Sequence, residues 1–330
     1  MSALALDLPP TKGRMQADAP LGPSTWFRVG GNAEALVRPS SPTDLAAFLA
    51  ALPHEVPVQV LGAASNLIVR DGGIAGVVLR LGRGFNEIVV QADGVVVGAA
   101  CLDAVVAEHA AAAGLSGLEF LSGIPGSIGG AVAMNAGAYG GDVAGCLDWV
   151  EVVARSGEQV RLPAAALALA YRHASLPPGG VVVRARFRAQ AGDKASIAAA
   201  MAEIRASREA TQPVRARTGG STFRNPPGQR AWELIDLAGC RGLAMGGAQV
   251  SEKHCNFLLN TGEATASDLE GLGEEVRRRV MAMSGVSLEW EIKRIGVPGA
   301  LTPALSRREK EIEKPSPLAR GLAEGFEVRA

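Results

Sequence analysis

Residues 121–141, LSGIPGSIGGAVAMNAGAYGG, are the glycine-richest tract of the chain and the first candidate for chemistry. Glycines leave room for backbone amides to converge on an anion at the start of a helix, where the helix dipole also favours negative charge. The tract is not a P-loop, because no Gly-Lys-Ser or Gly-Lys-Thr ends it, and its spacing does not fit the Rossmann fingerprint. A set of ordinary turns remains the alternative, but the length and the small residues favour a pyrophosphate cradle.

A second candidate is the segment at 61–73, LGAASNLIVRDGG, which predicts a strand, a small-residue turn and another strand. Such a turn, here with Ser65 and Asn66, lets a flat or anionic ligand contact the backbone. A tight hairpin is the more frequent explanation of the pattern. The segment alone therefore decides nothing.

A third candidate is TGGSTFRNPP at 218–227, which contains Ser221. Taken alone, Ser221 is a turn or capping serine, Arg172 is a solvent-facing arginine, and Glu291 is an outward residue of an alternating strand. No local pattern brings these three residues together, since they lie far apart in the chain.

Short strands that alternate with helices must position these segments. Runs rich in β-branched residues predict strands at 57–62, 66–70, 76–81, 86–91 and 94–100, which together imply a sheet. Helices are predicted at 42–52, with Ser41 as N-cap, and at 102–114, 194–212, 230–239 and 266–285. A hairpin is expected across 147–163, a long strand at 179–190, strands at 247–251 and 256–260, and a final strand at 286–296.

The same pattern predicts five parts of the chain. They are a loosely held arm at 1–24, a first unit at 25–192, a connecting helix at 193–213, a second unit at 214–296 and a disordered tail at 297–330. Truncation after Val297 is expected to leave stability and turnover unchanged.

Composition limits the classes of partner. The 330 residues include 33 Lys plus Arg and 33 Asp plus Glu, so no basic field favours nucleic acid or a membrane surface. The four widely spaced cysteines are expected to be free thiols, and no His or Cys spacing suits a metal. Without an export signal or a long apolar run, the chain is expected to be cytoplasmic.

The two glycine tracts, in this order, resemble the FAD-binding domain of the vanillyl-alcohol-oxidase-like flavoproteins. The chain as a whole resembles the UDP-N-acetylenolpyruvoylglucosamine reductase (MurB) family, type II-like. The resemblance rests on eight ordered motifs: FRVGGNAEAL, VLGAASNLIVRDGG, GLEFLSGIPGSIGGAVAMNAGAYGGDV, YRHASL, GGSTFRNP, AWELIDLAG, GGAQVSEKHCNFLLN and LEWEIKRIG.

The resemblance implies an α+β fold, with an FAD-binding domain of the vanillyl-alcohol-oxidase/PCMH type in two subdomains at 25–192. A smaller α+β substrate-binding domain would follow at 214–296. It also implies a monomer with non-covalently bound FAD that is reduced by NADPH. The residues expected to contact FAD are Gly62, Ala63, Ala64, Ser65, Asn66, Gly123, Ile124, Pro125, Gly126, Ser127, Gly129, Gly130, Asn135, Ala136 and Gly137.

The reaction implied by the resemblance is hydride transfer to the double bond of UDP-N-acetylglucosamine enolpyruvate, which yields UDP-N-acetylmuramate for the cell wall. Ser221 would protonate the carbon next to the carboxylate, Arg172 would bind that carboxylate, and Glu291 would donate to the developing enolate. Further expected substrate contacts are Tyr171 and Arg224 near the phosphates, Asn225 on the sugar, and His254.

One residue departs from the family pattern. Ala64 stands where the family usually has glycine before the Ser-Asn pair, and its methyl group would crowd the cofactor if the backbone needs positive φ. FAD is still expected to bind, because alanine is small. Two alternatives remain: an oxidase of the same superfamily that acts on small alcohols or hydroxy acids, and a non-catalytic module that binds flavin or a nucleotide sugar.

Overall fold

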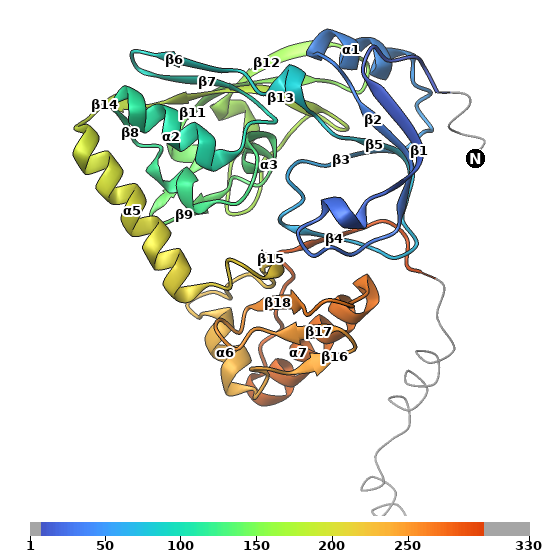
Figure 1. Ribbon diagram of the computed structural model, residues 1–330, viewed down its shortest axis with the longest axis vertical. Helices are drawn as coiled ribbons and strands as arrows, with labels where there is room; N and C mark the ends of the chain where they lie inside the picture. The colour runs from blue at the N-terminus through green and yellow to red at the C-terminus, as the bar shows by residue number, and fades with distance from the viewer. Residues whose placement is uncertain (1–7, 300–330) are drawn as a thin grey trace, which may run out of the picture. The chain divides into compact units, whose positions relative to one another are not determined.

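The first sheet begins with a strand in the segment where a loose arm is expected. The computed structural model describes residues 8–299, and β1 (Arg14–Pro20) pairs antiparallel with β2 (Asn32–Arg38). β5 (Ile74–Leu79) runs parallel to β2 and to β3 (Val58–Val60), so the strand order is β1-β2-β5-β3 (Figure 1). The predicted arm is therefore wrong from residue 14 onward. Its Pro and Gly residues flank a strand whose amides bond to β2.

Helix α1 (Pro42–Ala51) begins as predicted. The Ser41 hydroxyl accepts the backbone N–H of Asp44 at 3.1 Å, and Pro42 is the first helical residue, where its missing N–H costs nothing. Phe48 and neighbouring leucines of the helix are buried in a core shared with Val181 and Val183. The helix thus joins the first sheet to the second.

The second sheet is antiparallel throughout, and its strand order is β12-β11-β13-β7-β6. These strands span Gln159–Pro163, Leu147–Val153, Val181–Arg188, Gly94–Gly98 and Ile88–Gln91. Helices α2 (Asp103–Ala113), α3 (Ile128–Ala133) and α5 (Lys194–Thr211) pack with it around one large apolar core. The predicted hairpin of β11 and β12 is confirmed.

The five predicted strands between residues 57 and 100 do not form one sheet. β3 and β5 belong to the first sheet and β6 and β7 to the second, while β4 (Leu67–Val69) pairs with a strand from the far end of the described chain. All five runs have similar composition and similar boundaries. Composition reveals a strand but not its partner, so the prediction of a single sheet is wrong.

A third, smaller sheet has the order β15-β18-β17-β16. Its strands span Arg217–Ser221, Phe257–Asn260, Ala248–Val250 and Ala244–Met245. Helices α6 (Ala231–Leu237) and α7 (Ala266–Ser284) pack beside it (Figure 1). The buried residues of α7, among them Leu269, Leu272, Val276 and Val280, recur every three or four positions, which is the spacing of one helix face.

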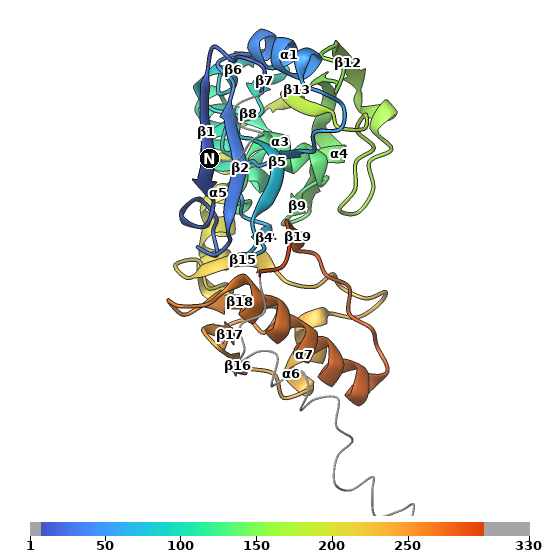
Figure 2. The same cartoon turned by 90° about the vertical axis from the view of Figure 1, so that its right-hand side faces the viewer.

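The predicted final strand at 286–296 is only partly formed. β19 (Lys293–Ile295) is its one strand segment, and it runs parallel to β4 rather than joining the third sheet (Figure 2). Trp290 makes an isolated bridge to Phe223. The segment changes partners between Trp290 and Lys293, and this change places Glu291 between two domains.

Short elements complete the described part of the chain. They are η2 (Gly22–Ser24), η3 (Arg83–Phe85), η4 (Glu119–Gly123), η5 (Ala164–Leu167), α4 (Val143–Cys146), β8 (Leu115–Ser116), β9 (Gly137–Ala138), β10 (Gly141–Asp142) and β14 (Gln190–Ala191). All four cysteines are free and buried, as expected. Within residues 8–299, no helix has the length and apolar character to cross a bilayer, and no three His, Cys, Asp or Glu residues gather as metal ligands.

The predicted tail falls mostly outside the described residues, which end at 299. Its first residue, Val297, belongs to the folded part. The Val297 amide donates to the Gly73 carbonyl at 2.9 Å, and the Gly72 amide donates to the Val297 carbonyl at 3.0 Å. The predicted tail therefore starts too early at 297.

Asp71, in the turn after β4, caps helix α7 of the third sheet's domain. One carboxylate oxygen accepts the Ala266 amide at 2.9 Å, and the other accepts the Ser267 amide at 2.9 Å and its hydroxyl at 3.0 Å. Amides at the start of a helix lack partners within the helix, and a carboxylate there is also favoured by the dipole. This cap joins two domains.

We expect Asp71→Ala to lower the free energy of unfolding by about 1.5–3 kcal/mol, the usual range for hydrogen bonds to charged groups. Hydrogen exchange should rise both at the start of α7 and in β19. Asp193→Ala is the matched control, since Asp193 caps α5 through the Ser196 amide within a single element. That variant should increase exchange only in α5. Unchanged exchange in β19 of Asp71→Ala would contradict a role between the domains.

Candidate active site

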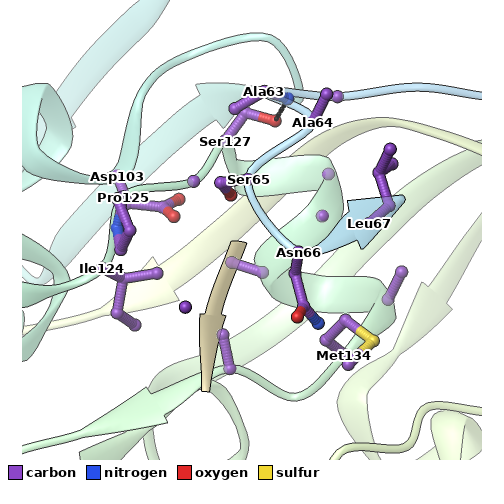
Figure 3. A pocket seen from close by; sticks show the side chains of 18 of the residues that line it. Ala63, Ala64, Ser65, Asn66, Leu67, Asp103, Ile124, Pro125, Ser127 and Met134 are labelled. Atoms are coloured by element: carbon purple, nitrogen blue, oxygen red, sulfur yellow. Dashed lines mark hydrogen bonds between the residues drawn. The ribbon is translucent and has the colours of Figure 1, made fainter. Parts of the chain in front are cut away.

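A pocket of about 540 Å³ brings the two glycine tracts together (Figure 3). All the residues expected to contact FAD line it except Asn135. The walls also include β15, the end of α5 and the segment that carries Glu291. The predicted catalytic residues Arg172, Ser221 and Glu291 therefore face the same space as the glycine tracts.

The turn at 62–66 is not a hairpin. β3 pairs with β5 in the first sheet, whereas β4 pairs with β19. The turn therefore connects two different sheets, and its residues line the pocket. The Ala63 amide donates to the Ser127 hydroxyl at 3.3 Å, which ties the first tract to the second (Figure 3). Within residues 8–299, the amides of Ser65 and Asn66 donate to no protein acceptor. They remain available to an anion.

The glycines of the second tract leave space that a side chain would fill. A Cβ atom at Gly126 would lie 2.5 Å from the Asp103 carboxyl oxygen, and one at Gly129 would lie 3.2 Å from the Ala99 Cβ. The following helix, α3, has only six residues, so its dipole is weaker than the sequence pattern suggests. Close backbone approach, more than a helix terminus, is what these glycines provide.

Two cations that sequence reasoning missed also line the pocket. Burial lowers the pKa of the Arg80 guanidinium, and the neighbouring Arg38 lowers it further; burial likewise lowers the pKa of Arg208. Within the described residues, the Arg80 side chain has no carboxylate partner. Half-buried positive charge in a pocket that is also lined by free backbone amides suits a diphosphate group. In the sequence, the one sign of a functional role for Arg80 is that it interrupts the apolar run GVVLRL.

Arg172 and Glu291 form an ion pair in the pocket wall. Nε of Arg172 lies 2.6 Å from Oε1 of Glu291, and the two side chains are only 21 % and 10 % exposed. Arg172 has a φ of 55°, an uncommon backbone conformation for a residue with a side chain. Such a conformation persists only where the surroundings hold it. It aims the guanidinium at Glu291.

Ser221 ends β15 next to this ion pair. The Glu291 amide donates to the carbonyl of the next residue, Thr222, at 2.8 Å. The buried side chain of Asn256 clamps Phe223 on both sides: Oδ1 accepts the Phe223 amide at 2.9 Å, and Nδ2 donates to its carbonyl at 2.8 Å. Sequence reasoning missed Asn256 because its neighbours in the chain say nothing of this contact.

Asn135 lies behind the pocket wall rather than in it. Its Nδ2 donates to the Ala170 carbonyl at 3.0 Å, and its Oδ1 accepts the Ala144 amide at 2.9 Å. Its side chain is almost fully buried. Asn135 therefore holds the loop that carries Arg172.

None of the four expected substrate contacts lines the pocket. Tyr171 is exposed, with its ring beneath the Arg172 guanidinium and within electrostatic reach of Glu291 and Arg224. Asn225 uses its side-chain oxygen to accept the Ala231 amide at the start of α6.

His254, the remaining expected contact, packs between aromatic rings. Its centroid lies 4.8 Å from that of Phe257 and 6.3 Å from that of Trp232. Burial lowers the pKa of its imidazole, and its Nδ1 has no partner among the described residues. The roles of these four residues in substrate binding stay predictions.

Comparison with known proteins agrees with this geometry. Residues 33–163 match the family model described as FAD binding domain, and residues 212–295 match that of the UDP-N-acetylenolpyruvoylglucosamine reductase C-terminal domain. The expected α+β fold, with an FAD-binding domain ahead of a smaller domain, is confirmed, as is FAD as the cofactor.

Individual relatives cover most of the chain. The UDP-N-acetylenolpyruvoylglucosamine reductase of Acidiphilium cryptum is 70 % identical over 291 residues, which are 88 % of this chain and 94 % of that protein. The protein of the same name from Gluconobacter oxydans is 62 % identical over 285 residues, or 86 % and 93 % of the two chains. The crystal structure of the Thermus caldophilus MurB has a TM-score of 0.76 at 37 % identity and covers 86 % of this chain and 99 % of its own.

Ala64, which stands where the family usually has glycine, adopts a left-handed backbone conformation. Its φ is 54°, it is 5 % exposed, and its carbonyl accepts the Trp26 amide at 3.2 Å. A left-handed conformation costs a non-glycine residue about 1–2 kcal/mol. The turn at 62–66 therefore carries strain at the point where it lines the pocket.

We expect Ala64→Gly to relieve this strain, to raise the melting temperature and to keep or tighten FAD binding. Ala63→Gly is the control, because Ala63 lacks a positive φ, and glycine there should lower stability by about 0.5–1 kcal/mol. Thermal unfolding and flavin fluorescence titration measure both effects. Equal destabilisation by the two substitutions would show that the conformation of Ala64 is not strained.

Proposed function

The chain belongs to the UDP-N-acetylenolpyruvoylglucosamine reductase family, and we propose from this premise that it reduces UDP-N-acetylglucosamine enolpyruvate to UDP-N-acetylmuramate with NADPH. It is an FAD-binding oxidoreductase of peptidoglycan precursor synthesis. Support for the finer proposal comes from Arg172, Ser221 and Glu291, which line one pocket with the glycine tracts. Monomeric state and cytoplasmic location stay predictions.

The pocket residues fit FAD. The free amides of Ser65 and Asn66 and the half-buried Arg80 would hold the diphosphate, and the glycines let the backbone approach the cofactor. When bound, FAD supplies hydride transfer from NADPH to the enolpyruvyl double bond. The protein must then bind the substrate carboxylate, keep water away and deliver a proton.

Arg172 would bind the substrate carboxylate. Its Nε is held by Glu291 and its Nη1 lies 3.4 Å from the Gly137 carbonyl, whereas Nη2 has no partner among the described residues. A guanidinium in a partly buried site attracts a carboxylate strongly, and the attraction grows as enolate charge develops on its oxygens. Arg172 would thus stabilise the enolate that forms when hydride is added to the double bond.

Ser221 would donate the proton to the carbon next to the carboxylate. Its hydroxyl is a weak acid in water, so the transfer needs the basic enolate that Arg172 stabilises. The serine oxygen then recovers a proton from water. Asn256 and the Thr222 contact with Glu291 keep the serine in place for this step.

Glu291 would orient Arg172. Its 2.6 Å contact to Nε fixes the rotation of the guanidinium in the pocket wall. The expected hydrogen bond from Glu291 to the developing enolate is a further part of the proposal. It needs the protonated acid, so Glu291 would not make it while it forms the ion pair with Arg172.

Two other functions are separable by simple measurements. A superfamily oxidase would reoxidise quickly with oxygen and would not need the GGSTF or EIKRIG motifs, both of which this chain has. A non-catalytic module would bind flavin without turnover. NADPH oxidation that rises on addition of UDP-N-acetylglucosamine enolpyruvate excludes both.

We expect Ser221→Ala to leave flavin reduction by NADPH within about threefold of wild type and to slow flavin reoxidation by substrate by about 10²–10⁴-fold, the usual contribution of a general acid. Stopped-flow absorbance of the flavin separates the two half-reactions.

Thr222→Val is the matched control for Ser221→Ala. The Thr222 hydroxyl is fully buried, has no partner among the described residues and does not line the pocket. Valine has nearly the same shape, so both half-reactions should keep their wild-type rates. Equal slowing of both half-reactions in Ser221→Ala would argue against the proposed role of the serine.

A further inference from the structure

Asp103, the first residue of α2, is buried without a partner. It is 0 % exposed, and neither carboxyl oxygen has a hydrogen-bond partner within residues 8–299. Burial raises the pKa of this carboxyl group to about 8. A buried polar group without a partner is costly and calls for a physical reason.

Asp44 shows that this fold can satisfy a buried carboxylate in the first turn of a helix. Asp44 is 6 % exposed and accepts four bonds of 2.7–3.0 Å, from the Ser40 amide and hydroxyl, the Lys12 amide and the Thr11 hydroxyl. Burial alone would raise its pKa, but these donors outweigh burial and lower it to about 2. Asp103 has no such donor among residues 8–299, so a partner from outside these residues is needed to satisfy it.

The surroundings of Asp103 place its carboxyl group at the cofactor pocket. Asp103 lines the pocket, and Figure 3 shows its side chain directed into it beside Pro125. The Asp103 amide donates to the Gly126 carbonyl at 3.2 Å, so α2 is tied to the second glycine tract. Gly126 does not have a positive φ, yet a Cβ there would lie 2.5 Å from Oδ2 of Asp103. A side chain at 126 would collide with the carboxyl group, and glycine avoids this collision.

The titratable neighbours do not favour ionisation. Cys101, just before α2, has a thiol whose pKa is raised by burial and further by Asp103. Arg80 lines the same pocket but does not lower the pKa of Asp103, which burial alone shifts. A neutral acid also avoids repulsion from a dinucleotide diphosphate and retains one O–H donor.

We propose that Asp103 is a cofactor-binding residue, held as the neutral acid, that donates a hydrogen bond to an acceptor atom of FAD. The proposal rests on FAD binding by this family and not on the proposed reduction of the nucleotide sugar. FAD binding is thereby linked to a proton. The affinity for FAD is constant below the pKa that the Asp103 carboxyl group has in the protein without FAD. Above that pKa the affinity falls as pH rises, by up to tenfold per pH unit.

The test compares FAD affinity in the full-length holoenzyme and its variants from pH 6.5 to pH 9.5. Dilution of the holoenzyme releases flavin, and the fluorescence of free flavin gives the Kd. The wild type should bind FAD with constant Kd up to about pH 8 and weaken above it. Asp103→Ala should raise the Kd at pH 7 at least tenfold. The side-chain amide of Asp103→Asn donates at every pH. Its Kd for FAD should therefore stay within threefold of the wild-type value at pH 7 and should not increase above pH 8.

Thermal unfolding separates a ligand contact from a structural role. Without FAD, Asp103→Ala should melt no lower than wild type, because it removes a carboxyl group that has no partner within residues 8–299. Asp103→Asn should melt close to wild type, because it exchanges one unpartnered polar group for another. Added FAD should raise the melting temperature of Asp103→Ala less than that of wild type. Asp44→Ala, the control, should melt several degrees lower and keep the wild-type Kd and its pH dependence.

The proposal is overturned if Asp103→Ala binds FAD as tightly as wild type at pH 7. It is also overturned if Asp103→Asn retains the wild-type loss of affinity above pH 8. Neither result depends on turnover, so failure of the proposed reductase activity would leave the assignment of Asp103 intact.

Discussion

The arrangement of the site depends on one extended segment, residues 289–297, whose backbone bonds to two domains in succession. Its first half bonds to the segment after Ser221, and its second half bonds to the FAD-binding domain. The bonds are Arg224 N–H to Glu289 O (2.9 Å), Glu291 N–H to Thr222 O (2.8 Å), Lys293 N–H to Asn66 O (3.1 Å), Arg70 N–H to Ile295 O (2.9 Å) and Gly72 N–H to Val297 O (3.0 Å). Glu291 lies at the point where the backbone partner of the segment changes from the smaller domain to the FAD-binding domain. Its carboxylate is therefore set between the proposed proton donor and the flavin turn by backbone geometry.

That geometry is reached with backbone conformations that side chains rarely adopt. Ala64 and Arg172 have φ values of 54° and 55°, and both line the pocket. Each is held by neighbours: the Trp26 amide bonds to the Ala64 carbonyl, and Asn135 holds the loop before Arg172. Strain of this kind persists when surrounding contacts determine the local structure. The ordered core of each domain is what allows the site to remain strained.

The sequence predicts local structure well where the signal is local. Ser41 and Pro42 mark the start of α1, and Ser156 and Gly157 lie in the turn between β11 and β12. It fails where a strand's partner is distant: β4 and β19 lie more than 200 residues apart and have no shared pattern. The grouping of Arg172, Ser221 and Glu291 followed from family resemblance alone. In the sequence, Asp103 looks like an ordinary acidic residue at a helix start, because only the fold shows that its carboxyl group has no partner among the described residues.

The unpaired polar groups of the pocket are expected to couple ligand binding to stability. Within residues 8–299, the Asp103 carboxyl group has no hydrogen-bond partner and the half-buried Arg80 has no carboxylate partner. The buried carboxyl group of Asp103 costs about 1–3 kcal/mol when it is left unsatisfied. A ligand that provides an acceptor for the acid and negative charge for the arginine removes these costs only in the folded state, so its binding stabilises that state. The same groups that weaken the free protein therefore select a ligand that is anionic and also offers a neutral acceptor.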